Sequence, residues 1–248
     1  MFKWIVYKNP ILFIIKTLKS VFERPFFFSE IIKQIYIIGA DGLPLIATAA
    51  AAVGIVLGLQ TGATLHRFGA QKYIAAIVGL SLVRELGPVL TALLVASRSG
   101  SGITAEIGAM KVTQQIDALR VSAISPLNYL VVPRLIACTI CLPLLTVIAD
   151  VVGIIGGGIV SVFTGLSTAG WYAKVTAQFI EFEDFFPGLI KAAFFGGIIA
   201  WISTYFGFNA PRGTQGIGKA TTTAVVTACL AILISDVILT KILLMVFP

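Results

Sequence analysis

The sequence predicts an all-α integral membrane protein with five transmembrane helices. An N-terminal interfacial helix precedes them, and a short cytoplasmic helix lies between spans two and three. Of the 248 residues, 58% are hydrophobic and only 12% are charged, whereas soluble domains carry about 25% charged residues. The mean hydropathy is +0.99. No hydrophilic stretch is long enough for a separate soluble domain, so we interpret residues 1–248 as one domain.

The N-terminal segment, residues 1–38, alternates apolar and basic side chains. This pattern is typical of an amphipathic helix that lies in the headgroup plane of a membrane, with its lysines directed toward lipid phosphates. A solvated basic tail is the alternative, and the phenylalanine run at 26–28 disfavours it. The pattern rests on Phe13, Ile14, Ile15, Leu18, Val21 and Phe22 against Lys16, Lys19 and Arg24.

Five apolar segments are long enough to cross a bilayer, which takes about 20 residues per helix. The third contains Pro133 and Pro143 and is expected to be tilted or kinked. Residues 166–186 carry Trp171, Tyr172 and an acidic cluster, and they predict an interfacial loop or short helix. The spans are expected at about 43–65, 74–97, 127–165, 187–208 and 221–247.

The distribution of lysine and arginine predicts the orientation. With the N-terminus in the cytoplasm, the inside segments hold most of the eighteen basic residues. The outside loops hold Arg67, Lys72, Lys174 and Lys191, together with the acidic cluster Glu181, Glu183 and Asp184. Five spans then place the C-terminus on the outer side.

The first span carries glycines at four-residue spacing, Gly54, Gly58 and Gly62. In lipid, two overlapping GxxxG steps allow a second helix backbone to approach closely. The spacing therefore predicts a helix-packing face, either within one chain or across a dimer.

Residues 103–125 are too polar to span and predict a short amphipathic helix against the inner face of the membrane. It could simply connect two spans, or it could dock in a cytoplasmic ATPase and transmit its motion. The apolar positions are Ile107, Met110, Ile116 and Leu119, and Glu106, Lys111, Gln114, Gln115, Asp117 and Arg120 lie between them.

Four stretches of the sequence carry a resemblance to a known family. VLGLQ (56–60), LVRELGPVLTALLVASRSGSGITAEIGAM (82–110), QIDAL (115–119) and PLLT (143–146) closely resemble the MlaE/YrbE-type permeases of lipid-transporting ABC systems. The resemblance covers about residues 43–247 and is most specific in its long central block.

This resemblance implies a homodimeric permease in a bacterial inner membrane, with an N-terminus in the cytoplasm and a C-terminus in the periplasm. Its implied partners are a separate cytoplasmic ABC ATPase, which holds ATP and magnesium, a periplasmic MCE-domain protein and a small STAS-like regulatory subunit. Phospholipid would move through a cavity between the two copies, along a pathway that includes Gln60, Arg84, Glu85 and Asp236.

The stretch that resembles the coupling helix of the family is 104–119, and it would contact the ATPase. The family often has Glu where this chain has Gln114, so one contact would be a neutral and weaker hydrogen bond. The ATPase-coupling residues implied are Glu106, Met110, Gln114, Gln115 and Asp117.

Arg84 and Glu85 place two charges inside the second span. Each ionisable group costs about 2.5–3.5 kcal/mol at the centre of a span on insertion scales, so a functional role is the first hypothesis. Neighbouring helical side chains point about 100° apart, so we expect them to have different partners. They could form a buried structural network, or they could contact a lipid headgroup, whose phosphate would favour Arg84. Asp150 and Asp236 are further candidates for the pathway.

No catalytic, metal or cofactor site is expected on this chain. Residues 213–220 nearly match a phosphate-binding loop but have Ala220 where a hydroxyl is needed. Cys138 and Cys141 lack a second pair, and the single histidine, His66, has no acid to orient it. The basic residues do not form a nucleic-acid-binding face. The alternative function is an ion- or proton-coupled secondary transporter that uses Arg84, Glu85, Asp150 and Asp236.

Overall fold

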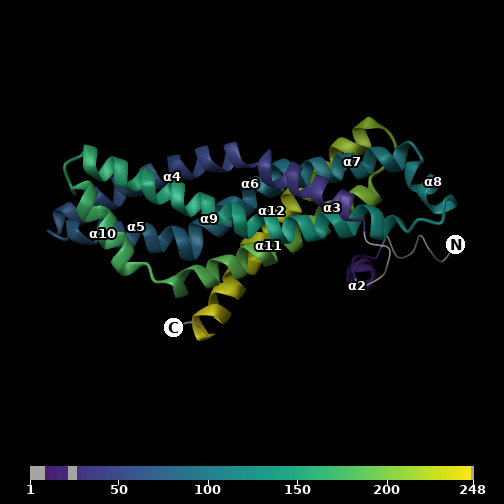
Figure 1. Ribbon diagram of the computed structural model, residues 1–248. Helices are drawn as coiled ribbons and strands as arrows, with labels where there is room; N and C mark the ends of the chain where they lie inside the picture. The colour runs from purple at the N-terminus through teal and green to yellow at the C-terminus, as the bar shows by residue number, and fades with distance from the viewer. Residues whose placement is uncertain (1–8, 22–26, 247–248) are drawn as a thin grey trace. The chain divides into compact units, whose positions relative to one another are not determined.

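The computed structural model describes residues 9–21 and 27–246 (Figure 1). This part of the chain is helical and contains no strand. Five helical stretches within it are long and apolar enough to cross a membrane, which confirms the predicted all-α class and the number of candidate spans. They cover Phe28–Arg67, Gln71–Val112, Leu127–Phe163, Glu183–Asn209 and Thr214–Val246.

The second stretch is longer than predicted, because it does not end at residue 97. Its helices and turns follow one another without a break as η2 (Gln71–Tyr73), α5 (Ile74–Ser81), η3 (Leu82–Leu86), α6 (Gly87–Val95), η4 (Ala96–Gly100) and α7 (Ser101–Val112). Both η3 and η4 are π-helical turns, which are frequent at functional sites in α-helices. The polar residues of these two turns therefore continue the helix instead of ending it.

The amphipathic segment predicted over 103–125 does not form one continuous helix. The chain turns after α7 at Gln114, whose φ of 61° lies in the left-handed region, and a separate short helix follows, α8 (Gln115–Val121). A left-handed residue other than glycine interrupts a right-handed helix. Residues up to Val112 therefore belong to the long second helical stretch, and only α8 is separate from it.

The third stretch comprises η5 (Leu127–Val131) and α9 (Val132–Phe163), which stays helical through Pro143. A short helix, α10 (Ala169–Phe179), follows. A loop and a short helix were the two structures predicted for residues 166–186, and the structure has the helix. The Thr168 hydroxyl accepts a hydrogen bond from the Trp171 amide at 3.4 Å and so caps the start of α10. The last two long helices are α11 (Phe182–Asn209) and α12 (Thr214–Val246).

The chain divides into two compact units, which we describe separately. The first unit comprises Met1–Gly42, Val95–Cys141 and Ala193–Ile234. It contains α2 (Pro10–Val21), α3 (Phe28–Ile35) and η1 (Tyr36–Ala40), with α7, α8 and the adjoining parts of α9, α11 and α12.

Within the first unit, α2 has a buried face and an exposed apolar face. Phe13 is fully buried and its ring packs against those of Tyr205 and Phe208, at centroid distances of 5.7 and 5.9 Å. Ile11, Ile15 and Leu18 are exposed. The helical part of the N-terminal prediction is thus observed over α2, whereas Phe22, Arg24 and Phe26 lie outside the described residues. The membrane location of α2 stays a prediction.

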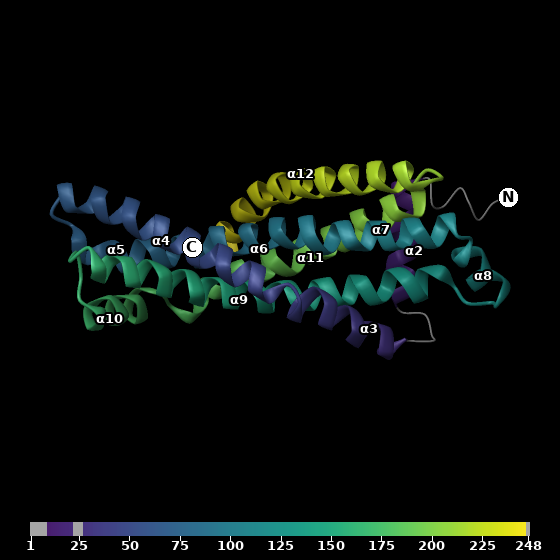
Figure 2. The ribbon, with the colours of Figure 1, turned by 90° about the horizontal axis from the view of Figure 1, so that it is seen from above.

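The second unit comprises Leu43–Leu94, Leu142–Ala192 and Ser235–Pro248. Its first helix, α4 (Leu43–Arg67), packs against α5 (Figure 2). Helix α5 also packs against α10. The core between α5 and α10 is built from Ile74, Val78 and Val175 around Tyr172. Burial raises the pKa of Tyr172 to about 12, so its hydroxyl stays protonated and donates to the Ile154 carbonyl at 3.2 Å.

Two glycines of α4 face α9 inside the second unit, and a third faces the segment that follows α9. A Cβ on Gly54 would run into the backbone of Gly153, and one on Gly58 would lie 2.9 Å from the Gly157 carbonyl oxygen. Gly62 faces the side chain of Leu166. Close backbone approach of this kind is what small residues allow in lipid, and here the contact is within one chain.

Candidate functional site

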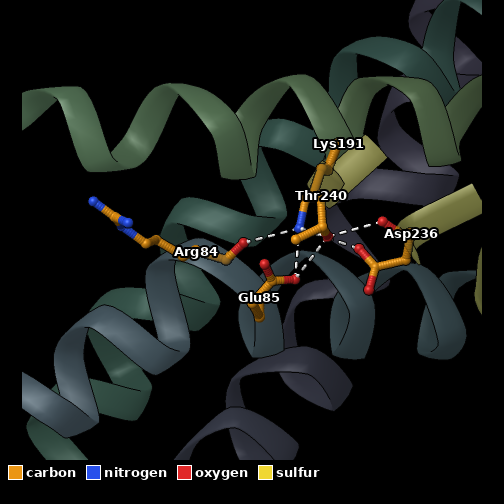
Figure 3. Close-up of polar contacts among 5 residues, drawn as sticks. All are labelled: Arg84, Glu85, Lys191, Asp236 and Thr240. Carbon is orange, nitrogen blue, oxygen red and sulfur yellow. Dashed lines mark hydrogen bonds and ion pairs between the residues drawn. The ribbon is translucent and has the colours of Figure 1, made fainter. Parts of the chain in front are cut away.

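A cluster of charged side chains lies inside the second unit, around the ammonium group of Lys191 (Figure 3). Lys191 projects from α11 and is 1% exposed. Its Nζ donates to Glu85 Oε2 at 2.5 Å and to Thr240 Oγ1 at 2.7 Å. Asp236 Oδ1 lies 3.3 Å from the same nitrogen. Helices α11 and α12 and the π-helical turn η3 therefore meet at one buried cation.

Arg84 has a different partner, as the 100° separation of neighbouring helical side chains predicts. Its Nε and one terminal nitrogen donate to Asp184 Oδ1, at 2.8 and 2.5 Å. The second oxygen of Asp184 accepts the Glu181 amide at 2.9 Å. Figure 3 shows the guanidinium pointing away from the Lys191 cluster, while the Arg84 carbonyl oxygen faces Lys191. Arg84 and Glu85 therefore link η3 to two positions on α11.

A cavity of about 210 Å³ adjoins both pairs. Two cationic and four acidic side chains line it, so its formal charge is negative. Asp184 is 7% exposed, whereas the Arg84 side chain is 43% exposed and keeps N–H donors that Asp184 does not engage. Its charged lining residues are Arg84, Glu85, Glu181, Glu183, Asp184 and Lys191, and its other lining residues are Pro187, Thr240, Leu243, Leu244 and Val246.

The structure brings together three of the four residues predicted for the pathway, Arg84, Glu85 and Asp236. Gln60 is exposed on α4 and does not line this cavity. Lys191 is absent from the predicted site residues, because the predicted orientation counts this lysine among the residues of the outside loops. The available signal was its position among apolar residues, in the stretch PGLIKAAFF (187–195).

Asp150 lies on α9 beside the backbone of Gly87 and is buried. Its Oδ1 has no hydrogen-bond partner among the described residues. Asp150 is thus separate from the Lys191 cluster, which joins Glu85 and Asp236.

The sequence of the chain matches a known family of membrane proteins. A family model described as Permease MlaE matches residues 31–242. The chain belongs to the MlaE permease family. A probable ABC transporter permease protein of Rickettsia typhi is 43% identical over 232 residues, which cover 94% of this chain and 90% of the relative.

Two further relatives support the same membership. The intermembrane phospholipid transport system permease protein MlaE of Haemophilus influenzae is 39% identical over 217 residues, covering 87% of this chain and 83% of that protein. A probable ABC transporter permease protein of Synechocystis is 40% identical over 205 residues, covering 83% of this chain and 78% of the relative. This MlaE-family chain is a multi-pass membrane protein, and its relatives are named as permease subunits of ABC transporters.

In this MlaE-family permease, the residues implied for ATPase coupling lie on α7, α8 and the turn between them. Gln114, Gln115 and Asp117 are exposed, and Met110 is half-buried. Asp117 bonds Arg120 on the same helix at 2.9 Å. Exposed pairs of this kind contribute about 0.2–1 kcal/mol, so Asp117 is free to exchange its partner at little cost.

Glu106 has a structural partner that its predicted role did not include. Its Oε2 lies 2.6 Å from a terminal nitrogen of Arg134, which is 3% exposed. Arg134 also donates to the Leu130 carbonyl at 2.6 Å. Glu106 therefore neutralises a buried arginine of α9, within the first unit.

Substitutions at Glu106 and Asp117 should separate stability from coupling. We expect Glu106→Gln to lower the melting temperature of the purified protein, because it leaves the buried charge of Arg134 without its counter-ion, and an unpaired buried charge costs about 3–5 kcal/mol. Asp117→Lys should leave the melting temperature within error and reduce co-purification of the ABC ATPase that the family resemblance implies. Thermal unfolding in detergent and quantitative pull-down measure the two effects. An unchanged melting temperature for Glu106→Gln would contradict the structural role of the pair.

Proposed function

We propose that this chain is the membrane-spanning subunit of an ABC-type phospholipid transporter. The observation that carries the proposal is its membership of the MlaE permease family, with 39% identity to a permease of an intermembrane phospholipid transport system. Two copies would form the permease in a bacterial inner membrane, with the N-terminus in the cytoplasm and the C-terminus in the periplasm. Phospholipid would pass through a cavity between them.

The energy would come from a separate cytoplasmic ABC ATPase that binds ATP and magnesium. An MCE-domain protein would exchange lipid with the permease on the periplasmic side, and a small STAS-like subunit would regulate the ATPase. The exposed turn at Gln114, with Gln115 and Asp117 on α8, suits docking to the ATPase.

The cavity beside Arg84 suits a zwitterionic headgroup. Its acidic lining would attract an ammonium group, and the guanidinium of Arg84 keeps N–H donors for a phosphate. Lys191 is enclosed by its own partners and would hold η3, α11 and α12 together. A buried structural network and contact with a lipid headgroup were the two roles predicted as alternatives for Arg84 and Glu85. Under this proposal the site has both roles.

Arg84→Lys tests the headgroup role separately from the structural one. A lysine keeps a positive charge for Asp184 but loses the planar set of N–H donors. We expect a melting temperature close to that of the wild type, with phospholipid transport lowered about tenfold or more, as the loss of one charged hydrogen bond predicts. Arg84→Ala should lower both quantities, while ATPase association persists. Wild-type transport by Arg84→Lys would assign Arg84 a purely structural role.

A secondary transporter coupled to ions or protons is the second candidate function. It is favoured by Asp150, a buried carboxyl with an oxygen that has no hydrogen-bond partner among the described residues. Purification of the tagged chain in mild detergent distinguishes the two functions. A stoichiometric ATPase, an MCE-domain protein and bound phospholipid support the ABC transporter. A chain recovered without ATPase and lipid would favour the ion-coupled carrier.

A further inference from the structure

A second polar cavity, of about 280 Å³, lies within the first unit between the α3–η1 segment and the helix formed by η4 and α7. It shares no lining residue with the cavity beside Arg84. Its lining residues are Gln34, Ile37, Ile38, Arg98, Ser99, Gly102, Ile103 and Glu106.

Two buried polar side chains line this cavity. Ser99 is 7% exposed, and its hydroxyl has no hydrogen-bond partner among the described residues. Gln34 is 2% exposed and brings an amide, which carries both donors and an acceptor. Buried hydroxyl groups in folded proteins are almost always hydrogen-bonded, so an orphan one calls for an explanation such as a missing ligand. The π-helical turn η4 places Arg98 and Ser99 at the same cavity.

The charges around the cavity favour a ligand with one negative charge. Glu106 reaches the cavity but is neutralised by Arg134, at 2.6 Å. Arg98 is exposed, and it donates a single long hydrogen bond to the Ile37 carbonyl, at 3.3 Å. Its guanidinium therefore has donors available and leaves the cavity with one uncompensated positive charge. A guanidinium fork, an amide and a hydroxyl are together a suitable donor set for a phosphate.

The remaining walls of the cavity are apolar, and they indicate an amphiphile. Ile37, Ile38 and Ile103 line it. Ile32 on α3 and Tyr36 on η1 are exposed. An apolar surface therefore continues along the α3–η1 segment beside the polar groups. We propose that this cavity binds the phosphodiester group of a phospholipid through Arg98, Ser99 and Gln34, as a second headgroup site. The lipid source of the phosphate rests on the proposed transport function, whereas the phosphate chemistry does not.

Gly102 offers a way to fill the cavity without disturbing the fold. A Cβ on Gly102 would meet no atom within 4 Å, so Gly102→Leu projects into open space and favours the helix. Gly218→Leu is the matched control, because Gly218 is also an exposed helical glycine with no atom within 4 Å of its Cβ position, and it does not line the cavity. Arg98→Gln removes the charge and keeps most of the side-chain length.

The experiment uses the full chain in phosphatidylcholine nanodiscs that contain a phosphatidylethanolamine with a photoactivatable acyl chain. After irradiation and proteolysis, we expect labelled peptides from residues 28–42 and 95–112. Arg98→Gln and Gly102→Leu should each reduce this labelling about tenfold, and Gly218→Leu should not change it. Equal labelling of the wild type and Gly102→Leu, or labels confined to other helices, would overturn the site.

Two additional measurements are made. The first distinguishes a lipid phosphate from free phosphate, and the second distinguishes failure of this site from failure of the proposed transport function. An excess of inorganic phosphate should leave the labelling intact, whereas its complete loss would assign the cavity to free phosphate and overturn the lipid ligand. ATP-driven transport is measured on the same preparations with the partner ATPase. Labelling without transport would remove the proposed function but keep the site, and transport without labelling would remove the site alone.

Discussion

Replacing Lys191 by methionine should abolish transport and lower the melting temperature more than any other single substitution at the charge cluster. The ammonium group is buried and contacts Glu85, Asp236 and Thr240. Methionine fills a similar volume but leaves two carboxylates without their cation. Removing one partner from a buried ion pair costs about 3–5 kcal/mol. Thermal unfolding in detergent and a reconstituted transport assay measure the two losses.

A combined variant distinguishes loss of folding from loss of function. Glu85→Gln and Asp236→Asn, added to Lys191→Met, remove both stranded charges, so the melting temperature should recover while transport stays absent. Lys174→Met on the exposed side of α10 is the matched control and should be silent. Wild-type stability and transport for Lys191→Met alone would refute the role given to the cluster.

Gly54→Ala should destabilise the protein, although alanine is the better helix former. Helix propensity alone favours alanine over glycine by about 1 kcal/mol. The new methyl group would, however, run into the backbone of Gly153 on α9, and a backbone cannot rotate away as a side chain can. Overpacking of this kind costs about 1–3 kcal/mol, so we expect the packing term to exceed the propensity term and the melting temperature to fall.

Gly197→Ala is the control for Gly54→Ala, because the chemical change is the same but no fall in melting temperature is expected. Gly197 lies inside α11, and a Cβ there would meet no atom within 4 Å. Its melting temperature should stay constant or rise. If Gly54→Ala also raised the melting temperature, α4 and α9 would not be in the close contact described above.

The fold class was predictable because it depends on composition and on the length of apolar segments. Both are local properties of the sequence. Helix ends were less predictable, since the second stretch runs to Val112 through polar residues that a hydropathy pattern reads as a boundary. Two π-helical turns, at Leu82–Leu86 and Ala96–Gly100, keep this stretch helical. Such turns have no clear sequence signal.

The candidate site was predictable only in part. Two adjacent charges in an apolar segment identified Arg84 and Glu85, because the cost of burying them is a local argument. Their partners are about a hundred residues away, at Asp184 and Lys191, and no periodicity in one sequence connects such positions. Glu106 shows the converse error: its amphipathic position predicted an external contact, but its partner is Arg134, a buried residue of the same chain.

Under the proposed function, the chain has two polar cavities for lipid headgroups, and they differ in charge. One lies beside Arg84 with an acidic lining, and the other lies beside Arg98 with one uncompensated positive charge. Arg84 and Arg98 belong to one continuous helical stretch, at its two π-helical turns.

The central claim is that ATP hydrolysis by a partner drives phospholipid movement through this chain. The most direct test reconstitutes the purified permease with its co-purified ATPase in liposomes and follows a fluorescent phospholipid, with Lys191→Met as the inactive control. We predict movement that requires ATP, stops with ADP and is indifferent to proton or sodium gradients. Movement that needs an ion gradient and proceeds without ATP would contradict the assignment.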